Sequence, residues 1–298
     1  AKHYECQIVS DVRDLWPKTQ VEMSKLHFLS PYTYLLYAAQ WAMVRWSSAL
    51  VTPLPGAYKY FDKIDQNKKV FTIENGFSFF KGEAIVPDSL NITACSKNLP
   101  FSNLDVLGID DIRSSSQLIV GYSGAFDRDN DIDSIMSAIR YLSNRDDVMF
   151  VFLGDGKRKK EIVQLASENR NVLVLSRVDS RFVPMILDCM DICYCGLKPK
   201  SIYQYGVSLA KSYEYMAAKK PIIWMIDAYN NPVENADCGY SVSPGDVGSL
   251  ISTIDQASKL PKDQLREMGN SGYNYLCENH SYKVLGKQWN SLVESFEK

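Results

Sequence analysis

The sequence lacks a large excess of charge of either sign. Its 298 residues carry 33 Lys and Arg against 35 Asp and Glu, which gives a formal net charge of -2. Without a strong overall field, the chain as a whole does not attract nucleic acid or an anionic bilayer. An anionic ligand would have to be held by local groups, and we predict no nucleic-acid partner.

The cysteines form no spacing pattern that is typical of disulfides or of a zinc site. The seven cysteines are scattered and odd in number, which is typical of reduced thiols in a cytoplasm rather than of a disulfide framework. Cys193 and Cys195 are one residue apart, with no second pair or histidine nearby, so they do not fit the usual zinc-ligand spacings. We predict a cytoplasmic protein with no metal and no cofactor.

We also expect no secretory leader, because no charged, then apolar, then small-residue stretch opens the sequence. One long apolar run stands out: residues 28–51 have Arg45 as their only formal charge and are long enough to cross a bilayer. Pro31, Gln40 and Arg45 argue against insertion, while the tyrosines and tryptophans are typical of a buried or interfacial helix. We favour a buried helix and leave open a membrane-facing surface and a spanning helix.

The second half of the chain alternates short apolar runs with helical patterns. Strands are predicted at residues 117–122, 148–153, 171–175, 192–195, 221–226 and 239–242. Helices are predicted at residues 131–144, 157–169, 181–189, 209–219, 247–258 and 261–278. Continuous apolar strands separated by helices are typical of a parallel sheet covered on both faces, so we predict a doubly wound α/β domain.

The first half is less regular. Strands are predicted at residues 6–9, 49–51 and 69–73, with a long helical region at 20–50 and a helix at 56–65. These elements do not complete a doubly wound sheet. Residues 77–116 have no clean period and contain two prolines and a triple serine, so we place the domain linker there.

Two glycine-containing loops follow predicted strands, where open parallel sheets bind ligands. The loop ending at Gly124 allows backbone amides to approach a phosphate, although it does not fit the dinucleotide pattern G-x-G-x-x-G. Gly154 and Gly156 precede the basic run at residues 157–160, and such charge runs usually face water. The glycines can still shape the floor of a cleft.

The third loop leads into the predicted helix at 209–219. If Ser208 caps this helix, the first amides point outward at the positive end of the helix dipole. Lys211 adds a second positive charge there, which is unfavourable unless an anion binds. Glu214 lies on the same helix face, where it could bind the two hydroxyls of a ribose or form a simple i,i+3 ion pair with Lys211. Spacing alone leaves both interpretations open.

Taken in order, these pieces resemble the C-terminal, donor-binding domain of GT-B glycosyltransferases of the family-4 group, which are mostly retaining enzymes that use nucleotide diphosphate sugars. The matching stretches are Val-Gly-Tyr-Ser-Gly at 120–124, Phe-Leu-Gly-Asp-Gly at 152–156, and residues 172–178, 190–197, 205–223 and 236–246. In the first half, residues 9–17, which end in Asp-Leu-Trp-Pro, and the Glu-Asn-Gly-Phe turn at 74–77 also match. Residues 205–218 look closest to bacterial enzymes that build surface polysaccharides on lipid carriers.

The resemblance implies an α/β fold of GT-B type with two domains. A complete doubly wound, Rossmann-like C-terminal domain would span residues 106–282. A partial N-terminal, acceptor-side domain would span residues 1–105, with residues 283–298 as a helix that returns to it. The family's usual opening strands have no counterpart, so we expect a fragment, a truncated form or a degenerate homologue. The three histidines, at positions 3, 27 and 280, are expected to be structural.

The resemblance also implies roles for residues. Glu214 falls on the second glutamate of the family's E-x7-E motif and would bind the ribose. The first glutamate falls on Gly206, so its contact with the transferred sugar would be missing. The family's phosphate-binding Arg and Lys fall on Ala125 and Asn130, so the charge would have to come from Lys211 and the amides after Ser208, assisted by Arg177 or Arg128. The predicted donor site comprises Ser123, Gly124, Gly154, Gly156, Arg177, Val178, Gly206, Val207, Ser208, Lys211 and Glu214, with Lys211 and Glu214 as catalytic residues.

The resemblance therefore predicts a retaining, metal-independent glycosyltransferase. The donor would be a nucleotide diphosphate sugar, UDP-linked, and the acceptor a polysaccharide or a lipid-linked glycan. The enzyme would act in the cytoplasm, with peripheral contact to the inner face of the membrane through its N-terminal domain. Two alternatives stay open: a catalytically inactive nucleotide-sugar-binding module, and a GT-B-type sugar-nucleotide epimerase.

Overall fold

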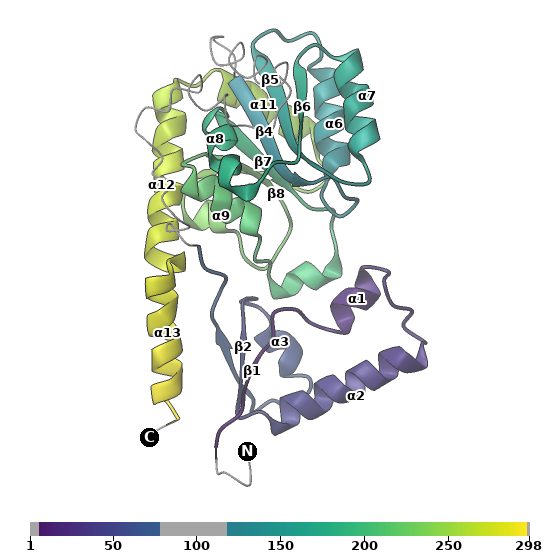
Figure 1. Cartoon of the computed structure of the whole chain (residues 1–298), viewed down its shortest axis with the longest axis vertical. Coiled ribbons are helices and arrows are strands. Elements are labelled where there is room, and N and C mark those ends of the chain that lie inside the picture. Colours follow the sequence, from purple (N-terminus) through teal and green to yellow (C-terminus); the bar gives the residue numbers. More distant parts are fainter. Residues whose placement is uncertain (1–5, 78–117, 297–298) are drawn as a thin grey trace.

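The computed structural model describes residues 6–77 and 118–296, which form two parallel β-sheets of three and six strands (Figure 1). The six-stranded sheet comprises β4 (Leu118–Ala125), β5 (Val148–Asp155), β6 (Val172–Ser176), β7 (Ile192–Gly196), β8 (Ile222–Met225) and β9 (Gly239–Ser241). Their order is β6-β5-β4-β7-β8-β9, and every neighbouring pair is parallel. Numbered from β4, this is the 3-2-1-4-5-6 order of a Rossmann sheet, whose direction of winding reverses between β4 and β7.

Helices cover both faces of this sheet. They are α6 (Ile132–Tyr141), α7 (Lys159–Glu168), α8 (Val183–Asp188), α9 (Ala210–Ala217), α10 (Pro232–Asn235), α11 (Val247–Ser258) and α12 (Lys262–His280), with 3-10 turns η3 (Ser180–Phe182) and η4 (Ser201–Tyr205). Alternate strand residues enter two separate cores: Val120 and Tyr122 pack with α6, α7 and α11, while Ile119 packs on the side of α8 and α9. The predicted doubly wound arrangement is confirmed.

The three-stranded sheet has the order β1-β2-β3, with β1 (Val9–Asp11), β2 (Ala49–Thr52) and β3 (Lys69–Thr72). Its helices are α1 (Lys18–Glu22), α2 (Pro31–Trp46) and α3 (Tyr58–Phe61). Every residue of the central strand β2 is buried, whereas β1 and β3 are partly exposed. The buried apolar strand therefore organises this smaller unit.

Some predicted boundaries in the first half are wrong. The strand predicted at 6–9 begins only at Val9, where pairing with Ala49 of β2 starts. The helical region predicted at 20–50 is two helices, because Ser24 adopts a φ of 56° and Pro31 starts α2 at a position that needs no backbone N–H. The helix predicted at 56–65 is shorter, since α3 has only four residues.

The C-terminal helix α13 (Tyr282–Glu294) follows α12 after Ser281 and runs beside the smaller sheet (Figure 1). Leu285 and Leu292 pack against Val51 of β2 and against Ile73. None of the helices in residues 6–77 and 118–296 has both the length and the apolarity needed to span a membrane, so the spanning helix considered for residues 28–51 is not formed. The predicted linker at 77–116 falls almost wholly outside the described residues.

Candidate functional site

The predicted site lies at the carboxyl edge of the six-stranded sheet, where β4 and β7 lie side by side and the winding reverses. Open α/β sheets bind ligands at this point. Helix α9 begins at the same edge, and Lys211 is its second residue. The buried strand β4 brings Tyr122 and Gly124 to the same place, because its last residues extend beyond the core.

The Lys211 side chain is held by neutral groups. Its Nζ donates to Asn130 Oδ1 at 2.5 Å and to the Tyr122 hydroxyl at 3.3 Å, and it lies 4.9 Å from the centre of the Tyr122 ring. A Cβ built on Gly124 would lie 3.6 Å from the same amine, so a side chain at this position would contact Lys211. No Asp or Glu among the described residues forms an ion pair with Lys211, and burial lowers its pKa.

The start of α9 differs from the prediction in one respect: Ser208 does not cap the helix. The N-cap is Leu209, whose apolar side chain cannot accept a hydrogen bond from the first helical amides, and the Ser212 hydroxyl donates to the Leu209 carbonyl at 2.7 Å. Ser208 Oγ instead accepts from Asn75 Nδ2 at 2.9 Å, because the turn after β3 reaches it. Within the described part of the chain, the amides of Leu209, Ala210 and Lys211 have no acceptor.

Glu214 lies one turn after Lys211 and is exposed. Its carboxylate has no hydrogen bond or ion pair with any described residue, so the simple i,i+3 pair with Lys211 is not formed. Enough of the protein surrounds the carboxyl group that desolvation raises its pKa, against the opposing charge of Lys211. The carboxylate is therefore available to a ligand.

The glycines at the ends of the neighbouring strands β4 and β5 lie beside each other in the sheet. Gly124 lies opposite Gly154, and a Cβ on Gly154 would come within 2.0 Å of the Gly124 carbonyl oxygen. A Cβ on Gly156 would come within 2.6 Å of the Phe126 carbonyl oxygen. Ser123, also predicted, is buried, and its backbone N–H and C=O are both bound by the Tyr215 hydroxyl. These positions shape the floor of the strand edge.

Arg177 and Val178, which were also predicted, follow β6, the strand beside β5. Arg177 is exposed beyond β6, and its charge lowers the pKa of Asp155 as the smallest of several contributions. Val178 is half-buried against the core. Neither contacts Lys211 in the described structure, so the geometry brings together only Gly124, Lys211 and Glu214 of the predicted donor residues.

Gly206, Val207 and Ser208 form the loop before α9, where the smaller unit packs on the larger one. A Cβ on Gly206, which has a φ of 105°, would come within 2.6 Å of Pro55 Cδ. The Val207 backbone exchanges two 2.9 Å hydrogen bonds with the Asn230 side chain. The sequence did not predict that Pro55, Asn75 and Asn230 contact this loop. Of these three, only Asn75 stood out in the sequence, as part of the Asn-Gly turn.

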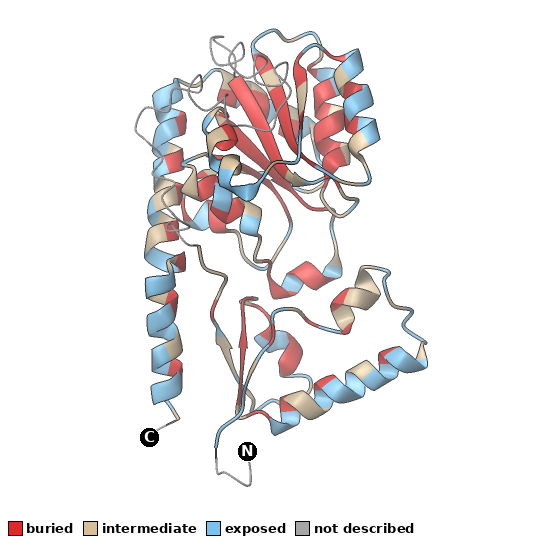
Figure 2. Cartoon of the chain, in the orientation of Figure 1, coloured by how far each residue is buried: buried red, intermediate tan, exposed pale blue. Residues whose placement is uncertain are grey.

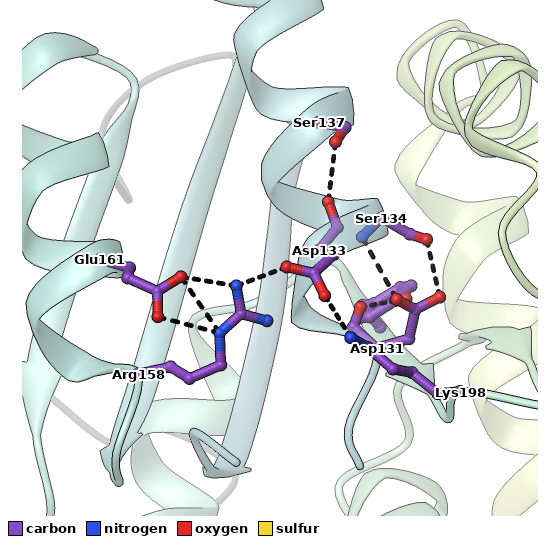
Figure 3. Close-up of polar contacts among 8 residues, drawn as sticks. Asp131, Asp133, Ser134, Ser137, Arg158, Glu161 and Lys198 are labelled. Atoms are coloured by element: carbon purple, nitrogen blue, oxygen red, sulfur yellow. Dashed lines mark hydrogen bonds and ion pairs between the residues drawn. The ribbon is translucent and has the colours of Figure 1, made fainter. Parts of the chain in front are cut away.

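The basic run at 157–160 is partly internal. Arg158 is bound by Asp133 and Glu161, and Lys198 pairs with Asp133 at 2.5 Å (Figure 3). The hydrogen bond from Lys198 and then that from Arg158 lower the pKa of Asp133. Because these cations are already paired, they stabilise the α6–α7 end of the sheet and do not supply a free phosphate-binding charge.

The chain is similar to known glycosyltransferases. Residues 117–259 match the family model described as Glycosyl transferases group 1, and no curated protein sequence matches. TarM from S. aureus, solved with Fondaparinux, alpha-GlcNAc-glycerol and UDP, has a TM-score of 0.66 and 13% identity over 98% of this chain and 52% of its own. For Anabaena HepE with UDP and glucose the values are 0.64 and 14%, over 99% and 73%. For a Rickettsia africae glycosyltransferase they are 0.67 and 16%, over 100% and 78%.

These comparisons confirm the resemblance to GT-B glycosyltransferases and establish the GT-B fold. The chain spans about half the length of TarM and about three quarters of the other two structures. Among the described residues, no cluster of three or more His, Cys, Asp or Glu side chains is arranged to hold a metal ion.

Proposed function

We propose that this chain, whose residues 117–259 match the group 1 glycosyltransferases and whose fold is GT-B, transfers a sugar from a nucleotide diphosphate donor to a polysaccharide or lipid-linked acceptor. The observation that carries the proposal is the Lys211 amine: a desolvated cation at a helix start, with free amides beside it and no carboxylate partner. An anion between these groups would supply the missing countercharge. A diphosphate fits this position at the sheet's reversal point.

In this proposal, Lys211 and the amides of residues 209–211 bind the diphosphate, and the Gly124 backbone lets it approach. Glu214 accepts hydrogen bonds from the ribose hydroxyls. Asn130, which aligns with a cation of the family, donates no charge but holds the Lys211 amine at 2.5 Å. The positive charge beside Asn130 thus comes from Lys211 on α9 rather than from a residue of the loop after β4.

We propose UDP as the nucleotide, supported by the UDP in the structures of TarM and HepE. As the bond to the sugar breaks, negative charge grows on the leaving diphosphate, and the prearranged amine and amides stabilise it. Retention of configuration and independence from metal ions belong to the proposal through the family resemblance. A cytoplasmic location is supported by Cys193, Cys195 and Cys238, which are buried free thiols.

An inactive nucleotide-sugar-binding module is the second candidate, and Gly206 favours it. The family's first glutamate cannot stand there, because even a Cβ would come within 2.6 Å of Pro55. The usual contact to the transferred sugar is therefore missing. No observation favours an epimerase: His280 is buried between Tyr213 and Tyr275, away from open solvent.

The two candidates are separated by measuring binding and turnover on the same protein. A thermal-shift panel of nucleotide sugars, UDP-sugars among them, identifies the donor, because a ligand that binds the folded chain raises its Tm. Hydrolysis and transfer of that sugar are then measured by the release of its nucleoside diphosphate. Stabilisation with turnover supports the transferase, stabilisation without turnover supports the binding module, and no stabilisation by any nucleotide sugar rejects both.

A further inference from the structure

A line of side-chain hydrogen bonds runs from the smaller sheet to the start of α9. Arg13, which follows β1, donates from Nη1 to Asn75 Oδ1 at 2.9 Å. Asn75, in the turn after β3, donates from Nδ2 to Ser208 Oγ at 2.9 Å. Ser208 directly precedes the N-cap of α9, whose first amides have no acceptor among the described residues. Two hydrogen bonds therefore connect a cation of the smaller unit to the segment that leads into the proposed diphosphate site.

The chemistry of the three groups fixes the direction of these bonds. A guanidinium has only donors, so the carboxamide oxygen of Asn75 must face Arg13. The amide nitrogen of Asn75, which can only donate, must then face the Ser208 hydroxyl. Because that hydroxyl oxygen accepts from Asn75, its own hydrogen is left to donate. Arg13 therefore determines how the Asn75 amide is turned, and Asn75 determines that Ser208 presents a donor.

The hydrogen of the Ser208 hydroxyl is poorly used within the protein. Its one other hydrogen-bond neighbour in the described part of the chain is the Tyr213 hydroxyl at 3.4 Å, whereas two bonded hydroxyls usually lie about 2.7–2.8 Å apart. The Tyr213 hydroxyl donates to Glu74 Oε2 at 3.3 Å, so it can only accept from Ser208. A phosphate oxygen beside the free amides of residues 209–211 is a better acceptor, since charge-assisted hydrogen bonds are about twice as strong as neutral ones.

The turn that carries Asn75 is itself held in place. Residues 74–77 are half-buried and run from the smaller sheet toward the larger unit (Figure 2). The Asn75 carbonyl oxygen lies 3.3 Å from His280 Nδ1, and a Cβ added to Gly76 would come within 2.6 Å of Leu285 on α13. A donor fixed in this way does not have to be ordered when a ligand binds, and such preorganisation favours affinity.

We propose that Asn75, turned by Arg13, is a positioning residue of the donor site: it holds the Ser208 hydroxyl and the free amides of residues 209–211 in the arrangement that binds a diphosphate. The inference rests on the proposed function and deepens it, because it makes the smaller unit part of a site whose other residues belong to the larger one. Asn75 acts through Ser208, so its loss affects the phosphates of the ligand and not the nucleoside.

The test is calorimetric binding of UDP and of uridine to Asn75→Ala, Ser208→Ala and the double variant. We expect each single variant to weaken UDP about tenfold, as for the loss of one oriented hydrogen bond, and to leave uridine unchanged. The double variant should bind UDP no more weakly than Ser208→Ala, because both substitutions break the same line. Asn67→Ala, at an exposed asparagine of the smaller unit, is the matched control and should bind both ligands like the unchanged chain.

Arg13→Met tests the first bond separately. The Arg13 side chain is 59% exposed and its ion pair with Asp11 lies at the surface, so its loss should leave thermal unfolding unchanged. Without a donor-only partner, the Asn75 amide can turn its oxygen toward Ser208, and we expect UDP affinity to fall about threefold. This fall should disappear when Asn75 is already replaced by alanine, whereas a direct electrostatic effect of Arg13 on the ligand would persist.

The proposal is overturned if Asn75→Ala binds UDP as tightly as Asn67→Ala, or if it weakens uridine as much as UDP. It is also overturned if the losses caused by Asn75→Ala and Ser208→Ala add in the double variant. If Asn75→Ala does not fold, Arg13→Met decides in its place, with unchanged UDP affinity as the contradicting result. Absence of UDP binding by the unchanged chain would reject the proposed donor site together with this inference, whereas UDP binding that Asn75→Ala leaves intact rejects this inference alone.

Discussion

Lys211 is the residue on which the donor site depends, because its amine contacts an amide oxygen, a hydroxyl and a ring but no carboxylate. Burial without a countercharge lowers its pKa in the unliganded protein. A bound diphosphate would favour the ammonium form and raise that pKa again. The residue is thus expected to couple binding to proton uptake.

This coupling predicts how UDP affinity depends on pH. Once pH exceeds the pKa of Lys211 in the free protein, binding must take up a proton, so affinity falls as pH rises toward 10.5, the ordinary lysine value. Calorimetry between about pH 7 and 9.5 should show this slope. Lys211→Met should bind weakly without the slope, whereas a slope retained in Lys211→Met would place the titrating group elsewhere.

Glu74 provides a prediction about stability. Burial raises the pKa of its carboxyl group more than the hydrogen bond from the Tyr213 hydroxyl lowers it. A raised carboxyl pKa means that the folded state loses stability as pH rises through the window above 4.5, so the ionised form is a cost at neutral pH.

We expect Glu74→Gln, which keeps an acceptor for Tyr213, to raise Tm at pH 7 by up to about 4 °C and to flatten the pH dependence near pH 5. Differential scanning calorimetry measures both. Glu278→Gln is the control, because this residue is exposed on α12. A lower Tm for Glu74→Gln would show that the carboxylate is stabilising.

Gly206 is predicted to be intolerant of a side chain. Its φ of 105° disfavours other residues, and a Cβ would meet Pro55 at 2.6 Å. We expect Gly206→Ala to cost about 1–3 kcal/mol in the free energy of unfolding by urea. Gly286→Ala, on α13 where nothing lies within 4 Å of an added Cβ, should instead stabilise by about 0.5–1 kcal/mol. Equal effects of the two substitutions would contradict this account of the contact between the units.

Part of the candidate site could be predicted from individual residues of the sequence. Lys211 and Glu214 stand out in the sequence because a cation at a helix start is electrostatically unfavourable without a ligand. The expected cap at Ser208 is wrong, since Asn75, over a hundred residues earlier, binds that hydroxyl. Such a contact depends on how two sheets pack, and no local spacing contains that information.

The joint between α12 and α13 is the element that ties the two sheets together. The Phe77 amide donates to the His280 carbonyl at 2.9 Å, and His280 Nδ1 lies 3.3 Å from the Asn75 carbonyl. The ring packs on Tyr213 and Tyr275, and its Nε2 is buried with no partner in the described structure. Burial lowers the pKa of His280, more than the hydrogen bond to Asn75 raises it.

A lowered histidine pKa makes this joint sensitive to acid. The unfolded chain takes up the proton more readily, so stability is lost as pH falls below 6.5. We expect His280→Phe, which keeps the ring packing, to lose less free energy of unfolding between about pH 7 and 5 than the unchanged chain. His27→Gln, an exposed site, is the control. If His280→Phe lost the same free energy of unfolding on acidification as the unchanged chain, other groups would be responsible. Glu74 would not be one of them, because its raised pKa acts in the opposite direction.

Elements of the larger sheet follow from sequence because their strands are continuous apolar runs buried on both faces. The short helix α10 and the turn η4 could not be predicted, since four or five residues do not establish a helical period. Helix α2 was predicted as a buried helix, but only Thr33, Gln40 and Val44 of its 16 residues are buried. Most of its large apolar side chains are exposed, which contradicts the favoured buried helix, although Val44 packs in the core.

At the scale of the molecule, the segment at 205–208, which leads into α9, is also part of the surface on which the smaller unit packs. The Gly56 amide donates to the Tyr205 carbonyl at 2.9 Å, and Lys59 Nζ lies 4.4 Å from the centre of the Tyr229 ring. Contacts between the units and the start of α9 therefore share one short segment. Ligand binding at α9 and the packing of the two sheets are expected to depend on each other.

The measurement that tests this account most directly is calorimetric binding of UDP and of uridine to the unchanged chain, Lys211→Ala, Glu214→Gln and the exposed control Lys160→Ala. We expect Lys211→Ala to weaken UDP by about 10- to 100-fold, as expected for the loss of one charge-assisted contact, and to leave uridine unchanged. Glu214→Gln should weaken both ligands, and Lys160→Ala neither. Equal affinity of Lys211→Ala and the unchanged chain for UDP would contradict a diphosphate site at the start of α9.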